Sequence, residues 1–190
     1  MIRRVTLDRK PELQRGYRLP FEGDVQISQG NNGPWSHFSF QNNGRRTPTT
    51  YDFRFSVDFK VPPGTQVIAA KDGIQCGFYN APEECYEGED IEGGWGVKTN
   101  FVFLRHENNM MTCYSHLSRE GFRFRDGEFV KQGEVIAETG MSGWIGPTPH
   151  LHFGVFSLLV DSVYMATFPV SFDNYHGTLD HAEVFSAASN

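Results

Sequence analysis

The sequence predicts an all-β fold, a compact antiparallel sheet domain with few or no helices, on three observations. Aromatic residues, which favour strands, are plentiful, with 17 Phe, 7 Tyr and 3 Trp. The chain also carries 20 Gly and 10 Pro, which supply tight turns between short strands. No stretch shows helical periodicity longer than about two turns. A chain of 190 residues fits one domain, so we expect residues 1–190 to form a single domain.

The strands are predicted by runs that alternate or are rich in β-branched and aromatic residues. In chain order these runs are 24–28, 51–59, 65–70, 74–78, 97–107, 110–117, two short strands within 128–140, and 150–156. Lys71-Asp72-Gly73 predicts a turn, and Asn108-Asn109 predicts the tight turn of a hairpin. A Gly/Pro/Ser-rich loop, 140–149, precedes the strand at 150–156.

Charge and hydropathy exclude several classes of protein. The formal net charge is −6, whereas a nucleic-acid-binding domain normally carries a basic face. No stretch approaches the roughly 18 apolar residues that a membrane helix needs. The N-terminal segment has no apolar core, so we expect no signal peptide in this chain. We therefore expect no nucleic-acid partner and no membrane span.

Two segments stand apart by composition. Residues 76–95 are rich in Glu and contain no Lys or Arg, which predicts a solvated acidic loop insertion or an acidic lip beside a substrate. Residues 175–190 lose the alternating pattern, which predicts a peripheral tail. Cys76 and Cys85 could close the acidic segment with a disulfide, but only in an oxidising compartment.

Two histidines two residues apart, His150 and His152, give the strongest chemical signal. In a strand such residues point to one face, while Leu151 points to the other. His116 ends another predicted strand, and Asp58 lies in a third. A carboxylate and imidazoles are ligands of catalytic zinc, which activates water and polarises a carbonyl for amide hydrolysis. The alternative is that the two histidines are ordinary surface residues.

Four segments, in this order, resemble the lysostaphin-type zinc metallopeptidases that cut peptides of bacterial peptidoglycan. They are VDFKVPPGTQVIAAKDG, YSHL, GEFVKQGEVIAETG and GPTPHLHF. The resemblance covers residues 35–156 as the matched peptidase core, with a closing strand at 168–172. It implies the duplicated hybrid motif fold of that family, with a groove over one zinc ion per chain.

The same resemblance implies roles for four residues. Asp58 stands six residues before the Gly of PPGT, as the aspartate ligand of the family does. Asp58 and His152 would be zinc ligands, and His116 and His150 would be the catalytic residues beside the water. Tyr114, two residues before His116, either reaches the site or packs in the core.

The chain departs from the family at the first histidine ligand. That histidine usually stands four residues before the aspartate, where this chain has Arg54, and arginine stays protonated. A branch of the family takes the first histidine from an earlier segment, and His37 is the matching candidate. We expect its segment to run as a strand beside the strand of Asp58. Asp52 is a reserve ligand, unless it pairs with an arginine such as Arg54.

The sequence therefore predicts a zinc endopeptidase that acts on cross-bridges or stem peptides of peptidoglycan. A degenerate, metal-free relative that only binds cell wall or a partner protein stays open. So does a carrier domain, because FVKQGEVIAETG also resembles the hairpin of lipoyl and biotinyl domains. We expect a monomer, leave open a regulatory protein partner, and expect a cell-wall-facing location, periplasmic or extracellular.

Overall fold

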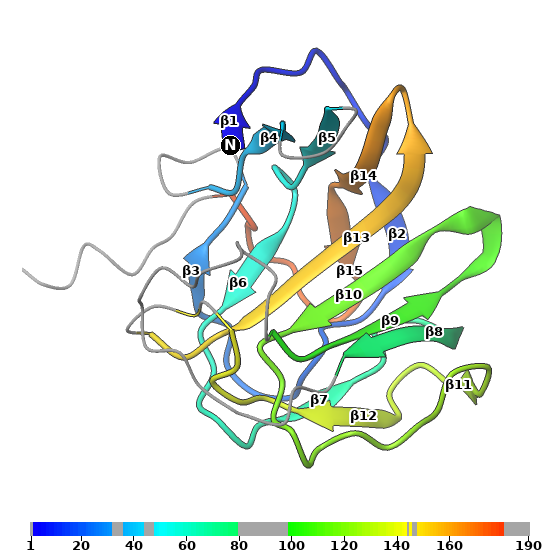
Figure 1. Ribbon diagram of the computed structural model, residues 1–190. Helices are drawn as coiled ribbons and strands as arrows, with labels where there is room; N and C mark the ends of the chain where they lie inside the picture. The colour runs from blue at the N-terminus through cyan, green and yellow to red at the C-terminus, as the bar shows by residue number, and fades with distance from the viewer. Residues whose placement is uncertain are drawn as a thin grey trace, which may run out of the picture.

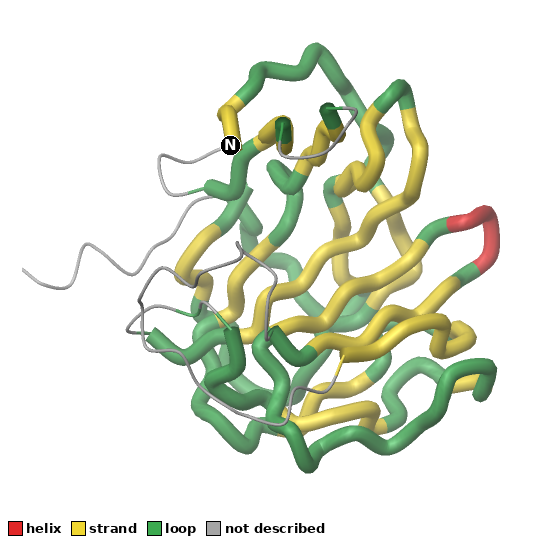
Figure 2. The backbone as a smooth tube through the Cα atoms, in the orientation of Figure 1, coloured by secondary structure: helices red, strands yellow, loops and turns green. Residues whose placement is uncertain are grey.

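The computed structural model of the protein consists almost entirely of strands, loops and turns (Figure 2). It describes residues 2–31, 36–43, 48–79, 99–143, 145 and 148–180. Within these residues the helical structure is one 3-10 turn, Glu107–Asn109. The all-β expectation is confirmed. No helix in the described part of the chain is long and apolar enough to cross a membrane.

Fifteen strands make up one large sheet and two small ones within the described residues. Their bounds are β1 (Ile2–Arg4), β2 (Gln14–Tyr17), β3 (Ile27–Gln29), β4 (Ser39–Asn42), β5 (Thr49–Asp52), β6 (Val57–Phe59), β7 (Gln66–Ile68), β8 (Gly73–Tyr79), β9 (Phe101–Arg105), β10 (Met111–Ser115), β11 (Phe129–Val130), β12 (Val135–Glu138), β13 (Leu151–Val160), β14 (Val163–Phe168) and β15 (Val170–Phe172).

The large sheet has the order β1-β4-β5-β14-β13-β10-β9-β8-β11, and β6 joins it by pairing with both β13 and β3. Most neighbours are antiparallel, but β14 runs parallel to β5. The small sheets are β7–β12 and the parallel pair β2–β15. Figure 1 shows β2 and β15 behind the large sheet and β7 and β12 at its lower edge.

The core lies between the large sheet and the small sheets. Along β13, Leu151, Phe153 and Val155 are fully buried and face this core, together with Val67 and Ile136 of the small sheets. Because strand side chains alternate, His152 points to the other face of the large sheet. We call this second face, which carries His152, the open face.

The predicted run 51–59 is broken in the structure. It forms β5 and β6, separated by a turn at Arg54–Phe55. The Asp52 carboxylate accepts hydrogen bonds from the Nε and Nη2 atoms of Arg54, at 2.9 Å each, and this closes the turn. A single continuous strand was therefore the wrong expectation here, because a local ion pair outweighs the extended pattern.

The hairpin that the sequence predicts is confirmed. Strand β9 pairs antiparallel with β10, and Asn108 and Asn109 between them adopt positive φ, which asparagine tolerates. Strands β1, β2 and β14 have no counterpart in the sequence prediction.

Of the acidic segment, residues 76–79 belong to β8, and the rest, including Cys85, lies outside the described residues. In the tail, Leu179 is buried in the core, whereas residues 181–190 lie outside the described part.

Candidate metal centre

Strand pairing brings Asp58 and His152 together. In the antiparallel pairing of β6 with β13, Asp58 lies directly opposite His152. By strand alternation both side chains point to the open face. They lie where β6 and β10 end and β13 begins, and Figure 1 shows these strand ends. The Nδ1 atom of His152 lies 2.8 Å from Oδ1 of Asp58. The Asp58 side chain is 6% exposed, so its carboxylate is an anion held almost out of water.

His37 comes from a distant part of the chain and joins this pair. Its Nε2 atom lies 3.5 Å from Oδ1 of Asp58, and its ring centroid lies 4.7 Å from that of His152. One ligand atom from each of the three residues lies within 4.8 Å of the others. His37 is placed by β4, which begins two residues later and pairs with β5. Pairing of its segment with the Asp58 strand was the wrong expectation, because β6 instead pairs with β3 and β13.

His116 and His150 lie side by side next to these three residues, with ring centroids 4.6 Å apart. His116 follows β10 with a φ of 65°, a left-handed conformation that takes its side chain out of the strand alternation. His150 immediately precedes β13, and its Nε2 atom lies 3.6 Å from Oδ2 of Asp58. The structure therefore brings together the three nominated ligands and the two nominated catalytic histidines.

Backbone carbonyls fix both catalytic candidates. Nδ1 of His116 lies 2.8 Å from the Ser142 carbonyl oxygen, and Nδ1 of His150 lies 2.9 Å from that of Thr148. A carbonyl only accepts hydrogen bonds, so each Nδ1 carries the proton when the ring is neutral. Each Nε2 is then a free base.

The loop 140–143 holds the Ser142 carbonyl in place. The hydroxyl of Ser142 accepts from the Asn100 N–H at 3.0 Å and donates to the Leu117 carbonyl at 2.8 Å. A Cβ at Gly140 would lie 2.7 Å from the backbone of Ser118, so only glycine fits this approach. Sequence reasoning missed Ser142 and Thr148, because they act through backbone oxygens. The Gly/Pro/Ser-rich composition of 140–149 was the available signal.

Burial shifts the pKa values of two of the imidazoles and of the Asp58 carboxyl group. Burial lowers the pKa of His37 to about 4 and that of His116 to about 3. Burial alone would raise the pKa of Asp58, but His37, His150 and His152 together hold it well below its usual range. Near neutral pH, His37 and His116 are therefore neutral, and Asp58 is a buried anion.

These residues fit a zinc ion. Imidazole nitrogen and carboxylate oxygen are zinc ligands, and they must be deprotonated to bind. A buried carboxylate is costly unless a cation compensates it. A metal held between His37, Asp58 and His152 would supply that cation.

Two other nominated residues lie elsewhere. Asp52, the reserve ligand, is fully buried in ion pairs with Arg9 and Arg54, so the pairing with Arg54 is confirmed. Tyr114 is fully buried in the core, and its hydroxyl accepts from the Ala70 N–H. The sequence had left Tyr114 open between the site and the core, and the structure places it in the core.

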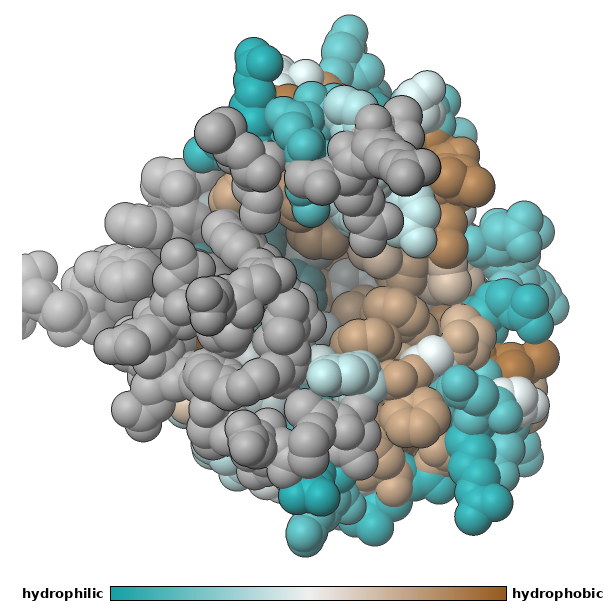
Figure 3. Space-filling model, in the orientation of Figure 1, coloured by the Kyte–Doolittle hydropathy of each residue, from teal (hydrophilic) through white to brown (hydrophobic). Residues whose placement is uncertain are grey.

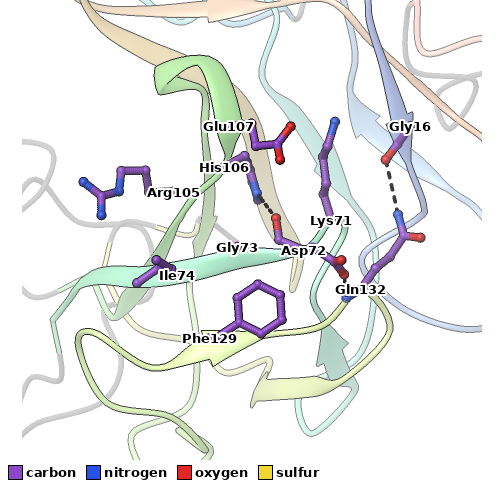
Figure 4. Close-up of a pocket in the computed structure, with 10 residues that line it drawn as sticks. All are labelled: Gly16, Lys71, Asp72, Gly73, Ile74, Arg105, His106, Glu107, Phe129 and Gln132. Carbon is purple, nitrogen blue, oxygen red and sulfur yellow. Dashed lines mark hydrogen bonds between the residues drawn. The ribbon is translucent and has the colours of Figure 1, made fainter.

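A separate hollow of about 590 Å³ opens beside β8 and β9, lined by Arg105, Glu107 and His106 among others (Figure 4). His106 is held by the Asp72 carbonyl, 2.7 Å from its Nδ1, and by Oγ1 of Thr112, 3.0 Å from its Nε2. The described lining of this hollow contains no residue of the metal centre. His106 is structural, as its place before a turn indicates.

Two curated relatives with peptidase names are similar to this chain. The chain is 39% identical over 114 residues to an uncharacterised metalloprotease of Haemophilus influenzae, covering 59% of this chain and 21% of that protein. It is 35% identical over 98 residues to the peptidoglycan DD-endopeptidase ShyC of Vibrio cholerae, covering 51% of this chain and 18% of that protein. The match thus spans about a fifth of the length of these relatives.

Among solved structures, the fold is similar to the catalytic domain of the prophage-encoded M23 protein EnpA from Enterococcus faecalis. That domain was solved as a point mutant. The TM-score is 0.50 at 18% identity, covering 79% of this chain and 93% of that chain. The fold is therefore that of a lysostaphin-type metallopeptidase. Residues 52–162 match Peptidase family M23, and the chain belongs to this family. Asp58, His116, His150 and His152 lie inside the matched segment, and His37 lies outside it.

Proposed function

We propose that the protein is a zinc-dependent endopeptidase that hydrolyses peptide bonds of bacterial peptidoglycan. The observation that carries this proposal is the gathering of one buried carboxylate and four imidazoles at one end of the open face. Family membership and the peptidoglycan endopeptidase among its relatives support the substrate class.

Three of these residues would hold the zinc and two would handle protons. His37, Asp58 and His152 supply the three protein ligands that a catalytic zinc needs. Zinc bound there supplies Lewis acidity, which polarises the peptide carbonyl and acidifies water. One zinc per chain is expected from this single ligand set.

His116 and His150 would carry the proton transfers. Each donates its Nδ1 proton to a backbone carbonyl, so each Nε2 can accept a proton from the attacking water. The imidazolium formed can return that proton to the leaving amine. An Nε2–H can also donate a hydrogen bond to the oxygen that becomes negative in the transition state. Burial lowers the pKa of His116 and keeps its ring neutral before the reaction, which suits a base.

The proposed substrate suggests where the enzyme acts and what it binds. We propose a cell-wall-facing location, periplasmic or extracellular, and peptidoglycan peptides as the partner. We also propose that residues 1–190 act as one domain and as a monomer, with a regulatory protein as a further partner to be sought.

Digestion of purified peptidoglycan from several sources tests the proposal. Mass spectrometry of the products should show new peptide termini that depend on zinc and disappear with a chelator. If zinc-loaded protein binds the cell wall but releases no peptide, the protein is a binding module and the endopeptidase proposal fails.

A further inference from the structure

An aromatic row continues the metal centre across the open face. His152 of β13 lies opposite Ser115 of β10, Ser115 lies opposite Phe101 of β9, and Phe101 lies opposite Tyr79 of β8. Residues directly opposite each other in a sheet share a face, so Phe101 and Tyr79 lie on the face that carries His152. Phe103, two residues along β9, lies on this face as well.

The rings of Tyr79, Phe101 and Phe103, which we call the aromatic shelf, form one stack. The ring centroids of Phe101 and Phe103 are 4.5 Å apart, with an interplanar angle of 24°. Those of Tyr79 and Phe101 are 6.1 Å apart, with an interplanar angle of 21°. The shelf is accessible, since Tyr79 is 40% exposed and both phenylalanines are partly exposed. In Figure 3 hydrophobic residues gather over the middle of the view, where β13, β10 and β9 run in Figure 1.

Within the described residues, the shelf and the surface that joins it to the metal centre carry no charged side chain. Cys113 and Ser115 of β10 lie between the shelf and β13 on this face. Stem peptides of peptidoglycan carry carboxylates and amines, whereas its N-acetylated sugars are neutral and present C–H groups that pack on aromatic rings. Leaving charged groups against an apolar surface is unfavourable. The chemistry of the shelf therefore fits the sugars better than the stem peptide.

We propose that the aromatic shelf is a subsite for the sugar rings of a peptidoglycan glycan strand. The proposal rests on the endopeptidase function proposed above and adds the part of the substrate that does not react. The shelf would hold the sugar that carries the stem peptide while the peptide reaches the metal centre. Tyr79 adds a hydroxyl at the exposed end of the stack, which can hydrogen-bond to sugar hydroxyls.

The distance between the aromatic shelf and the metal centre determines which peptide bond of the stem peptide can reach the zinc. Neighbouring strands lie about 4.8 Å apart, so Phe101 and Tyr79 stand about 10 and 14 Å from the strand of His152. An extended peptide covers about 3.4 Å per residue, so this distance corresponds to about three to four residues. The stem peptide starts at the sugar, so we expect cleavage near its far end and not next to the sugar.

Two measurements test the subsite. The first is NMR titration of the zinc-loaded protein with a neutral N-acetylglucosamine tetramer, which needs no catalysis. The second is the ratio of kcat/KM for a cross-linked disaccharide-peptide dimer to that for the same dimer freed of its sugars. Tyr79→Ala should abolish tetramer binding and lower this ratio about tenfold, mainly through KM, as expected for a lost aromatic contact. Phe101→Leu keeps the apolar volume but removes the aromatic ring, so it should also weaken tetramer binding and lower the kcat/KM ratio.

Phe78→Ala is the matched control. Phe78 is 47% exposed and adjacent to Tyr79 but points to the opposite face, where it contacts Phe122. It should leave both tetramer binding and the ratio unchanged. A wild type that does not bind the tetramer, or a Tyr79→Ala variant with the wild-type ratio, overturns the subsite. If the wild type cleaves neither dimer, the endopeptidase function fails, and the tetramer titration alone decides the subsite.

Discussion

Replacement of Asp52 by alanine should destabilise the fold without removing a metal ligand. The carboxylate is fully buried and accepts hydrogen bonds from Ser39 at 2.8 Å and from Arg54 at 2.9 Å. It also pairs with Arg9, whose side chain is 7% exposed. Asp52→Ala leaves this guanidinium as a buried charge without its partner, whereas Arg54, 30% exposed, can regain water.

An unpaired buried charge costs about 3–5 kcal/mol, so the free energy of unfolding should fall by that amount. For a chain of this length the melting temperature should fall by about 10 °C. Urea unfolding followed by circular dichroism measures the loss. Asp24→Ala, at an exposed position, is the control and should change stability by less than about 0.5 kcal/mol. A loss below about 1 kcal/mol for Asp52→Ala would refute the reasoning.

The effect should depend on pH with a definite sign. Burial raises the pKa of Asp52, but hydrogen bonds from Arg54 and Ser39 lower it more, so the folded pKa lies below the ordinary value. A depressed folded pKa stabilises the protein above the unfolded pKa of about 3.9, and the stabilisation is lost as pH falls through the folded pKa. The difference between wild type and Asp52→Ala should be full at pH 7 and shrink below about pH 4.

Three further predictions concern the site and its supports. His116→Ala and His150→Ala should each lower kcat by about 10²–10⁴-fold while most zinc stays bound; near-full turnover in either variant would remove its assigned role. Gly140→Ala should displace the loop that fixes His116 and lower kcat with zinc retained; unchanged kcat would show that the loop does not position the ring. Tyr114→Phe should cost about 1 kcal/mol of stability, measured by urea unfolding, and leave kcat unchanged, since its hydroxyl serves the core.

The part of the site that could be predicted follows strand alternation and local motifs. His152 and Asp58 each alternate with buried apolar neighbours in their own strands, so each could be placed on the face that points away from the core. The pairing of Asp52 with Arg54 was foreseen as an alternative because the two residues are close in sequence. The hairpin around Asn108 follows from turn chemistry that needs no distant partner.

The rest depends on contacts between distant segments. His37 reaches Asp58 through the pairing of β4 with β5, and no local pattern specifies which strands pair. The parallel pairing of β15 with β2 joins the two ends of the described chain and is equally invisible in local periodicity. The side chain of His116 is reoriented by a positive φ, and the residue type alone does not predict this conformation. These features are set by tertiary packing.

The zinc content of three proteins tests the central claim most directly. Elemental analysis should find about one zinc per chain in the wild type and in Asp52→Asn, which keeps the shape of the buried side chain. His37→Ala should bind zinc more weakly by orders of magnitude and lose activity. If His37→Ala retains one tightly bound zinc while Asp52→Asn loses it, the ligand set is Asp52, Asp58 and His152, and the account given for His37 is wrong.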